Sequence, residues 1–244
     1  MKIKISLLLF ILFFLTSCQT TETIYLNTDG SGNIETELLR DEQSYMQLVG
    51  ENYSKEEKFE DTTYVFKGFI DKYSETFLKL PAFEKDIFQK YASVNVHIKK
   101  SSYEKEFRTR ISQNFNNIEQ VPDLYKTQDY ADDLEHNYAL SAEEHYYHVS
   151  YTFDGSHFKR MVRITDLAEL KKQQDEISEL KSRFSNLKLN QPYLLSYHFP
   201  RKIKSVSNTN AILSEDKKSL ELRFLLTDCL QNPEMTNLEV VLEH

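Results

Sequence analysis

Oxygen-bearing side chains gather in one short loop near the N-terminus: Asn27, Asp29, Ser31 and Asn33. Their spacing is similar to that of a calcium-binding EF-hand loop, in which Gly32 would supply the sharp turn. However, Leu38 stands at the twelfth position, where such a loop requires a bidentate glutamate. The flanking residues also alternate between apolar and polar, as strands do. The sequence therefore predicts a polar hairpin turn, with calcium binding as the alternative.

Three histidines lie near a second predicted hairpin, His145, His148 and His157. Imidazoles are common zinc ligands, but all the ligands of one ion must approach it to about 2 Å. His145 and His148 are three residues apart, so in a strand they point to opposite faces. If Asp154-Gly155 forms a two-residue turn, His157 shares a face with His148 but lies about 13 Å along the ladder. No metal or other cofactor is predicted.

Six basic side chains could contact anionic lipid head groups if the protein lies close to a membrane. They form two groups: Lys159, Arg160 and Arg163, and then Arg201, Lys202 and Lys204. The alternative is ordinary solvated charge. Arg160 differs from the others because the alternation of the hairpin places it on the apolar face, among Val149, Phe158 and Val162.

The N-terminus has the pattern of an export signal. Two lysines precede an apolar run, Ile5 to Leu15, which is too short to span a bilayer. The run ends in Leu15-Thr16-Ser17-Cys18, which resembles the lipobox of bacterial lipoproteins. This resemblance implies that Cys18 receives lipid on its sulfur and becomes the first mature residue. An ordinary secreted protein is the alternative.

These features predict a signal peptide over residues 1–17, a lipidated residue and short tether over 18–22, and one domain over 23–244. Gln19, and not aspartate, follows Cys18. Under the sorting rule of enteric bacteria, this indicates the outer membrane. No acidic export run follows, so we expect the periplasmic face.

Bulk composition excludes several classes of function. A formal net charge of −8 gives no basic face for nucleic acid. With Cys18 lipidated, Cys229 has no partner for a disulfide and is expected to be a small buried hydrophobe. The sequence contains no catalytic serine elbow, no metalloprotease helix motif and no phosphate-binding glycine loop. A non-enzymatic role is therefore predicted.

Alternating residues predict many strands and few helices. Strands are expected near 24–26, 34–38, 94–99, 107–111, 145–164, 193–199, 220–226 and 238–242. Helices are expected over 41–50, 69–91 with a break at Pro81, 117–136 and 166–187. Asp166 and Glu169 form a capping box for the last of these. The order of these elements predicts an α+β fold with a largely antiparallel sheet, built from hairpins with helices packed against it.

Two segments together resemble uncharacterised envelope lipoproteins related to the LppM-like domain family. The first is residues 24–39, with Asn27-Thr28-Asp29-Gly30-Ser31-Gly32, and the second is residues 197–226, with Tyr197-His198-Phe199-Pro200. The resemblance implies an envelope domain of one sheet with packed helices, and lipid binding. We expect a membrane-anchored, non-catalytic binding or assembly module with a lipid or protein ligand. The alternative is an envelope hydrolase or other enzyme with an unrecognised site.

Overall fold

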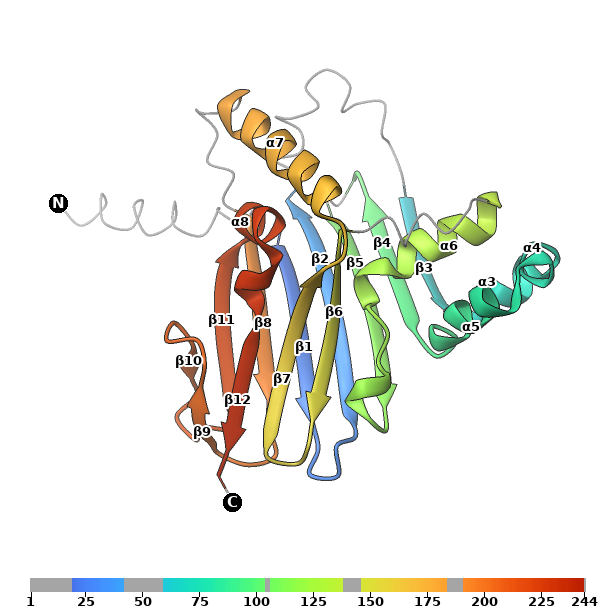
Figure 1. Ribbon diagram of the computed structural model, residues 1–244. Coiled ribbons are helices and arrows are strands. Elements are labelled where there is room, and N and C mark those ends of the chain that lie inside the picture. The colour runs from blue at the N-terminus through green and yellow to red at the C-terminus, as the bar shows by residue number, and fades with distance from the viewer. Residues whose placement is uncertain (1–18, 42–58, 104–105, 138–145, 184–190, 244) are drawn as a thin grey trace.

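The computed structural model describes residues 19–41, 59–103, 106–137, 146–183 and 191–243 (Figure 1). The predicted helix over residues 41–50 falls almost entirely outside these ranges. Two β-sheets and six α-helices make up the described part of the chain. The predicted α+β class is confirmed.

The larger sheet has eight strands in the order β10-β11-β8-β1-β2-β5-β4-β3. Their bounds are β1 Gln19–Leu26, β2 Gly32–Asp41, β3 Phe59–Val65, β4 Asn95–Ser101, β5 Glu106–Phe115, β8 Pro192–His198, β10 Ile212–Leu213 and β11 Ser219–Leu225. Strands β1 and β8 pair in parallel, and the other described neighbours pair antiparallel. The predicted antiparallel character is correct, whereas the parallel pair was not foreseen.

A smaller sheet lies against one face of the larger one (Figure 1). Its order is β6-β7-β12-β9, with β6 Tyr147–Phe153, β7 His157–Ile164, β12 Leu238–Leu242 and β9 Ile203–Val206. Side chains from both sheets meet between them, as the ring of Phe158 on β7 does with Tyr197 on β8, at 5.4 Å between centroids. The apolar faces of the central strands thus pack against the other sheet, whereas Tyr64 on β3 packs against Phe69 on α3.

The helices connect strands or cover their ends. They are α3 Phe66–Lys72, α4 Ser74–Lys79, α5 Ala82–Lys90, α6 Thr127–His136, α7 Leu167–Arg183 and α8 Leu226–Gln231, with 3-10 turns at Ile118–Gln120, Leu124–Lys126 and Pro233–Thr236. The predicted break at Pro81 is confirmed, since this residue precedes α5. The Asp166 carboxylate caps α7 by accepting hydrogen bonds from the backbone N–H of Ala168 and Glu169.

The predicted tether over residues 18–22 is wrong, because strand β1 begins at Gln19. Thr20 and Glu22 are buried, and the strand pairs on both sides, with β2 and β8. No slack therefore remains between Cys18 and the folded domain. Residue 18 itself lies outside the described residues.

The turn of the β6–β7 hairpin differs by one residue from the prediction. Phe153 pairs with Phe158, so Gly155 and Ser156 are the two central residues, where Asp154-Gly155 was expected. Gly155 has a φ of +94°, as the first position of a type II′ turn requires. The Asp154 carboxylate accepts hydrogen bonds from the N–H of Ser156 and His157, which favours this turn.

The turn correction moves every cross-strand partner by two residues but leaves the faces unchanged. Arg160 lies opposite Tyr151, where Val149 was expected, and Val149 lies opposite Val162. The buried side chains of the hairpin, Val149, Tyr151, Phe158, Arg160 and Val162, are on the predicted face. A shift of two preserves the face because side chains alternate with a period of two.

Candidate functional site

A buried ion pair joins the two sheets. Arg160 on β7 donates from Nε to Oε1 of Glu22 at 3.0 Å and from Nη2 to Oε2 at 3.1 Å. The two side chains are 1% and 0% exposed. Two parallel hydrogen bonds between guanidinium and carboxylate form the strongest geometry for such a pair. Arg160 therefore cannot contact lipid head groups, and that prediction is wrong for this residue.

Polar side chains complete the surroundings of this pair. The hydroxyls of Tyr125 and Tyr197 donate to the Glu22 carboxylate, and that of Tyr193 accepts from Arg160 Nη2 at 2.9 Å. Thr236 Oγ1 accepts from Arg160 Nη1 at 2.7 Å. Strands β1, β7 and β8 and two 3-10 turns thus contribute to a network that satisfies both charges, as buried charges require.

Electrostatics keeps both members of the pair charged. Burial alone would raise the pKa of Glu22, but the Arg160 charge and hydrogen bonds from Arg160, Tyr197 and Tyr125 outweigh it and hold this pKa below the ordinary 4.5. Burial also raises the pKa of Tyr125, Tyr193 and Tyr197 well above 10, so these phenols stay protonated and donate. The network therefore has a structural role, because it links the two sheets through a charged, fully buried ion pair.

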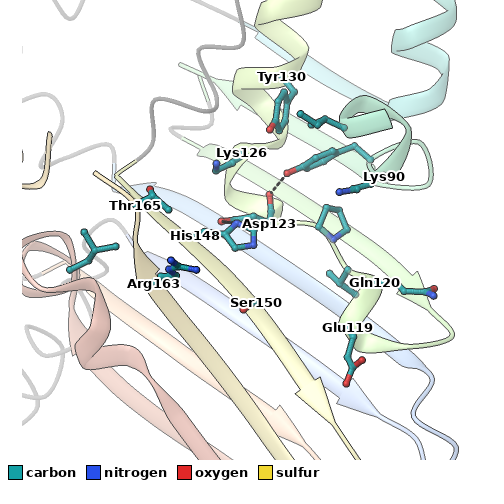
Figure 2. Close-up of a pocket in the computed structure, with 15 residues that line it drawn as sticks. Lys90, Glu119, Gln120, Asp123, Lys126, Tyr130, His148, Ser150, Arg163 and Thr165 are labelled. Carbon is teal, nitrogen blue, oxygen red and sulfur yellow. Dashed lines mark hydrogen bonds and ion pairs between the residues drawn. The ribbon is translucent and has the colours of Figure 1, made fainter. Parts of the chain in front are cut away.

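A cavity of about 740 Å³ lies on the outer side of the small sheet (Figure 2). Strands β6 and β7 form one wall, and the turns after β5 together with α5 and α6 form the other. The lining residues are Ile87, Lys90, Tyr91, Glu119, Gln120, Val121, Pro122, Asp123, Lys126, Tyr130, His148, Ser150, Arg163, Ile164 and Thr165. This volume falls within the range of small-molecule sites.

Asp123 is a buried residue that lines the cavity, and its carboxylate holds neighbouring backbone groups in place. It accepts hydrogen bonds from the backbone N–H of Val149 at 2.9 Å and of Tyr125 at 3.2 Å. His148 Nδ1 lies 3.5 Å from its Oδ2. Burial raises the pKa of Asp123, against the opposing effect of those hydrogen bonds and of the charges on His148 and Lys126. Asp123 therefore links the turn before α6 to β6.

Basic side chains outnumber acidic ones around the cavity. Lys90, Lys126, His148 and Arg163 line it, against Glu119 and Asp123. His148 and Arg163 are directly opposite each other across β6 and β7. His148 already lies beside the Asp123 carboxylate, whereas among the described residues Arg163 has no hydrogen-bond or ion-pair partner. An acidic group in the cavity would pair with Arg163.

The predicted calcium loop forms the turn between β1 and β2. Asp29 Oδ1 accepts hydrogen bonds from the N–H and hydroxyl of Ser31, and Asn27 Nδ2 donates to the Ser31 hydroxyl. Asn33 lies within β2, and its amide donates to Asn114. The predicted hairpin is confirmed, and these oxygens hold the turn together.

The histidines of the second hairpin do not converge. His148 is near one end of the ladder and His157 is at the other end, beside the Gly155 turn. His157 contacts Asp154, whereas His148 contacts Asp123. His145 lies outside the described residues.

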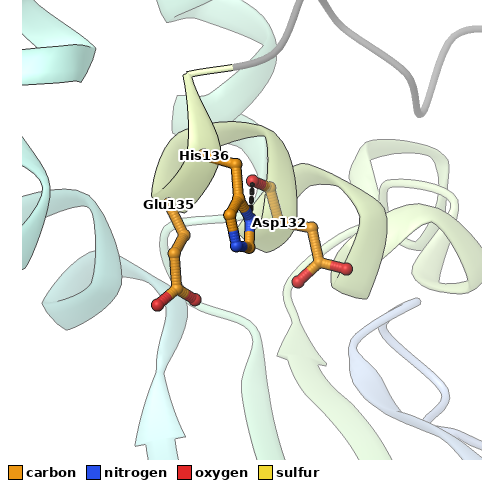
Figure 3. Close-up of side chains that lie close together, drawn as sticks. All are labelled: Asp132, Glu135 and His136. Atoms are coloured by element: carbon orange, nitrogen blue, oxygen red, sulfur yellow. Dashed lines mark hydrogen bonds between the residues drawn. The ribbon is translucent and has the colours of Figure 1, made fainter.

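One group of potential metal ligands occurs in the described part of the chain, at the C-terminal end of α6 (Figure 3). Ligand atoms of Asp132, Glu135 and His136 lie within 4.8 Å of one another, but all three residues are exposed. The Tyr73 hydroxyl already donates to Glu135 at 2.7 Å. Exposed acidic groups of this kind are common without a metal ion.

The remaining basic residues lie at opposite ends of the molecule. Arg163 is near the end of β7 that leads to α7. Arg201 donates to the carbonyl of Gly155, so Arg201, Lys202 and Lys204 cluster around the opposite end of this hairpin. Lys159 forms an ion pair with Glu239 at 2.8 Å. Lys159 therefore lies toward the same end as the Arg201 group, whereas Arg163 is separated from it by the length of β7.

Cys229 is buried in α8, and burial raises the pKa of its thiol to about 12. A protonated, buried thiol fits the predicted packing role. Within the described ranges, no helix has the length and apolar character needed to cross a membrane.

The chain is similar to a solved structure, the NMR structure of the folded domain of Mycobacterium tuberculosis LppM. The two chains are 10% identical, the TM-score is 0.43, and the similarity covers 93% of this chain and 90% of that one. No protein-family model and no curated protein sequence matches the chain.

Sequence reasoning missed the cavity and the partners of Arg160. The one signal was Arg160 itself, a charged residue on an otherwise apolar strand face. Glu22 gave no such signal, because it ends the polar segment Gln19-Thr20-Thr21-Glu22, which is typical of a tether.

Proposed function

We propose that the protein is a lipid-anchored, non-catalytic binding module of the bacterial envelope, and that its ligand occupies the cavity beside β6 and β7. The cavity carries this proposal, because it combines ligand-sized volume with Lys90 and Arg163, cations that have no partner among the described residues. An acidic group on the ligand would pair with them. Ile87, Val121 and Ile164 add apolar surface.

The start of the fold supports the anchor. Strand β1 begins at Gln19, the residue after the proposed lipidation site, so the folded chain and the mature chain would begin together. An outer-membrane location is part of the same proposal and rests on Gln19, the residue after Cys18, whereas the periplasmic face rests on the lack of an acidic export run after it.

An enzymatic role is the second candidate, because His148 contacts Asp123 and Ser150 lies two residues further on the same face of β6. That order of groups is typical of a serine hydrolase. In the described residues, however, no hydrogen bond joins Ser150 to His148. Both oxygens of the Asp123 carboxylate also accept hydrogen bonds from backbone N–H groups, which supports binding over hydrolysis.

The anchor is tested by Cys18→Ala. We expect the variant to lack acyl mass and to leave the membrane fraction, because stable anchoring needs the acyl chains attached to this residue. The matched control is Cys229→Ala, which removes the other cysteine and should leave both properties unchanged. An acylated, membrane-bound Cys18→Ala protein would refute the anchor.

The ligand site is tested by filling the cavity with Ser150→Phe. Native mass spectrometry of protein purified from its own membranes should show a bound ligand that this variant loses. Thr152→Phe is the control, since Thr152 lies on the same strand face but outside the lining. Equal ligand retention in the two variants would place the ligand elsewhere.

A further inference from the structure

The end of the domain at which β1 begins differs in character from the opposite end. The strand pairings define this end: Gln19 pairs with Leu39, Asp41 with Glu106, and Ser101 with both Glu106 and Phe59. These residues therefore lie along one edge of the large sheet, formed by strand ends. We call it the Gln19 edge.

The small sheet has its corresponding end on the same side. The Glu22–Arg160 ion pair fixes the relative level of β1 and β7. Three residues from that pair, toward this end, lie Gln19 on one strand and Arg163 on the other. Strand β7 then continues into α7, which lies beyond the Gln19 edge (Figure 1).

Exposed apolar side chains are concentrated at this end. Tyr103, Phe59 and Leu167 are 96%, 76% and 74% exposed, the three highest values for large hydrophobic side chains in the described residues. Phe59 begins β3, Tyr103 follows the end of β4, and Leu167 begins α7. Three such side chains in water are unfavourable, and they suit an interface that removes them from it.

The opposite end carries mainly polar turns, and its exposed apolar side chains include Ile212 on nearby β10, which is 67% exposed. It carries the β1–β2 turn with Asp29, the β6–β7 turn with Asp154, and Arg201 with Lys202. Its exposed aromatic residue, Tyr25, stacks on His198 with ring centroids 4.3 Å apart. Strand β1 separates the two ends by about 23 Å, because its eight residues span seven steps of about 3.3 Å.

We propose that the Gln19 edge rests on the lipid bilayer, with Phe59, Tyr103 and Leu167 in its interfacial region. This inference depends on the proposed anchor, because the absence of a tether would hold the start of β1 against the membrane that contains the acyl chains. Tyr103 suits the interfacial region because its ring is apolar and its hydroxyl is polar, and Phe59 and Leu167 add apolar surface. In this orientation, the part of the cavity that contains Arg163 faces the lipid head groups. The cluster of Arg201, Lys202 and Lys204 lies at the far end, away from them.

Fluorescence quenching in vesicles tests this orientation. The full lipidated protein would carry an environment-sensitive dye on Tyr103→Cys or on Lys202→Cys, in vesicles with quencher attached to the acyl chains. Cys18 would be acylated and Cys229 is buried, so the label goes to the introduced cysteine. We expect strong quenching at position 103 and little at 202. Equal quenching, or stronger quenching at 202, overturns the proposal.

A second comparison tests whether the apolar side chains make the contact. Phe59→Ser with Leu167→Ser should reduce quenching at position 103, whereas Leu78→Ser with Phe83→Ser should not. The control residues are 69% and 62% exposed but lie on α4 and α5. Unchanged quenching in the first pair overturns the contact. The mass of the purified protein separates the two hypotheses: without acyl mass the anchor fails, and with it the quenching decides the orientation alone.

Discussion

Arg160→Leu should lower the free energy of unfolding by about 3–5 kcal/mol, because it leaves the Glu22 carboxylate buried without its countercharge. The three tyrosine hydroxyls around the pair do not replace a full charge. Urea unfolding at neutral pH measures the effect. Arg163→Leu is the control, since this residue is on the same strand but exposed, and its cost should stay within about 0.5 kcal/mol.

A double variant separates the loss of the pair from the loss of packing. Glu22→Gln with Arg160→Met removes both charges, but it leaves an amide oxygen that can accept from Tyr125 and Tyr197. Replacing both members of a buried pair is often nearly neutral, so we expect most of the lost stability to return. If the double variant is as unstable as Arg160→Leu, the cause is packing around residue 160, and the unpaired carboxylate is not responsible.

The strands, the break at Pro81 and the start of α7 could be predicted because each depends on residues that are close together in the sequence. Alternation identified most strands, because one face of each packs against the other sheet or against a helix while the other face is more polar. The break at Pro81 and the capping carboxylate of Asp166 are properties of single residues, so sequence revealed them directly. The one-residue error in the hairpin turn arose because Asp154-Gly155 was interpreted as the central pair, although the Asp154 side chain caps the turn from outside it.

The features that sequence could not reveal depend on distant pairing. Strand β1 pairs in parallel with β8, and Gln19 and Tyr193 are more than one hundred and fifty residues apart in the numbering. Burial of Glu22 follows only from this pairing, so the residue was assigned to a tether. The cavity likewise needs β6 and β7 to meet the Asp123 turn. The sequence marked Arg160 only as a charged residue on an apolar strand face and did not identify its partner.

Val162→Asp tests the face assignment that sequence and structure share. Val162 is 5% exposed and lies opposite Val149 across the hairpin. An aspartate there would bury a charge with no partner positioned for it, and we expect a loss of several kcal/mol in the free energy of unfolding. Arg160 cannot compensate, because its guanidinium is already bound to Glu22 on the same face.

The control introduces the same carboxylate one residue earlier. Met161 is 40% exposed on the outer face of β7, so Met161→Asp should change the free energy of unfolding by roughly 0.5 kcal/mol or less. Urea unfolding of the two variants under one condition gives the comparison. Equal destabilisation would mean that the two faces of β7 are not distinguished by burial. In that case Arg160 would lose its place between the sheets, and the ion pair that joins them would have to be abandoned.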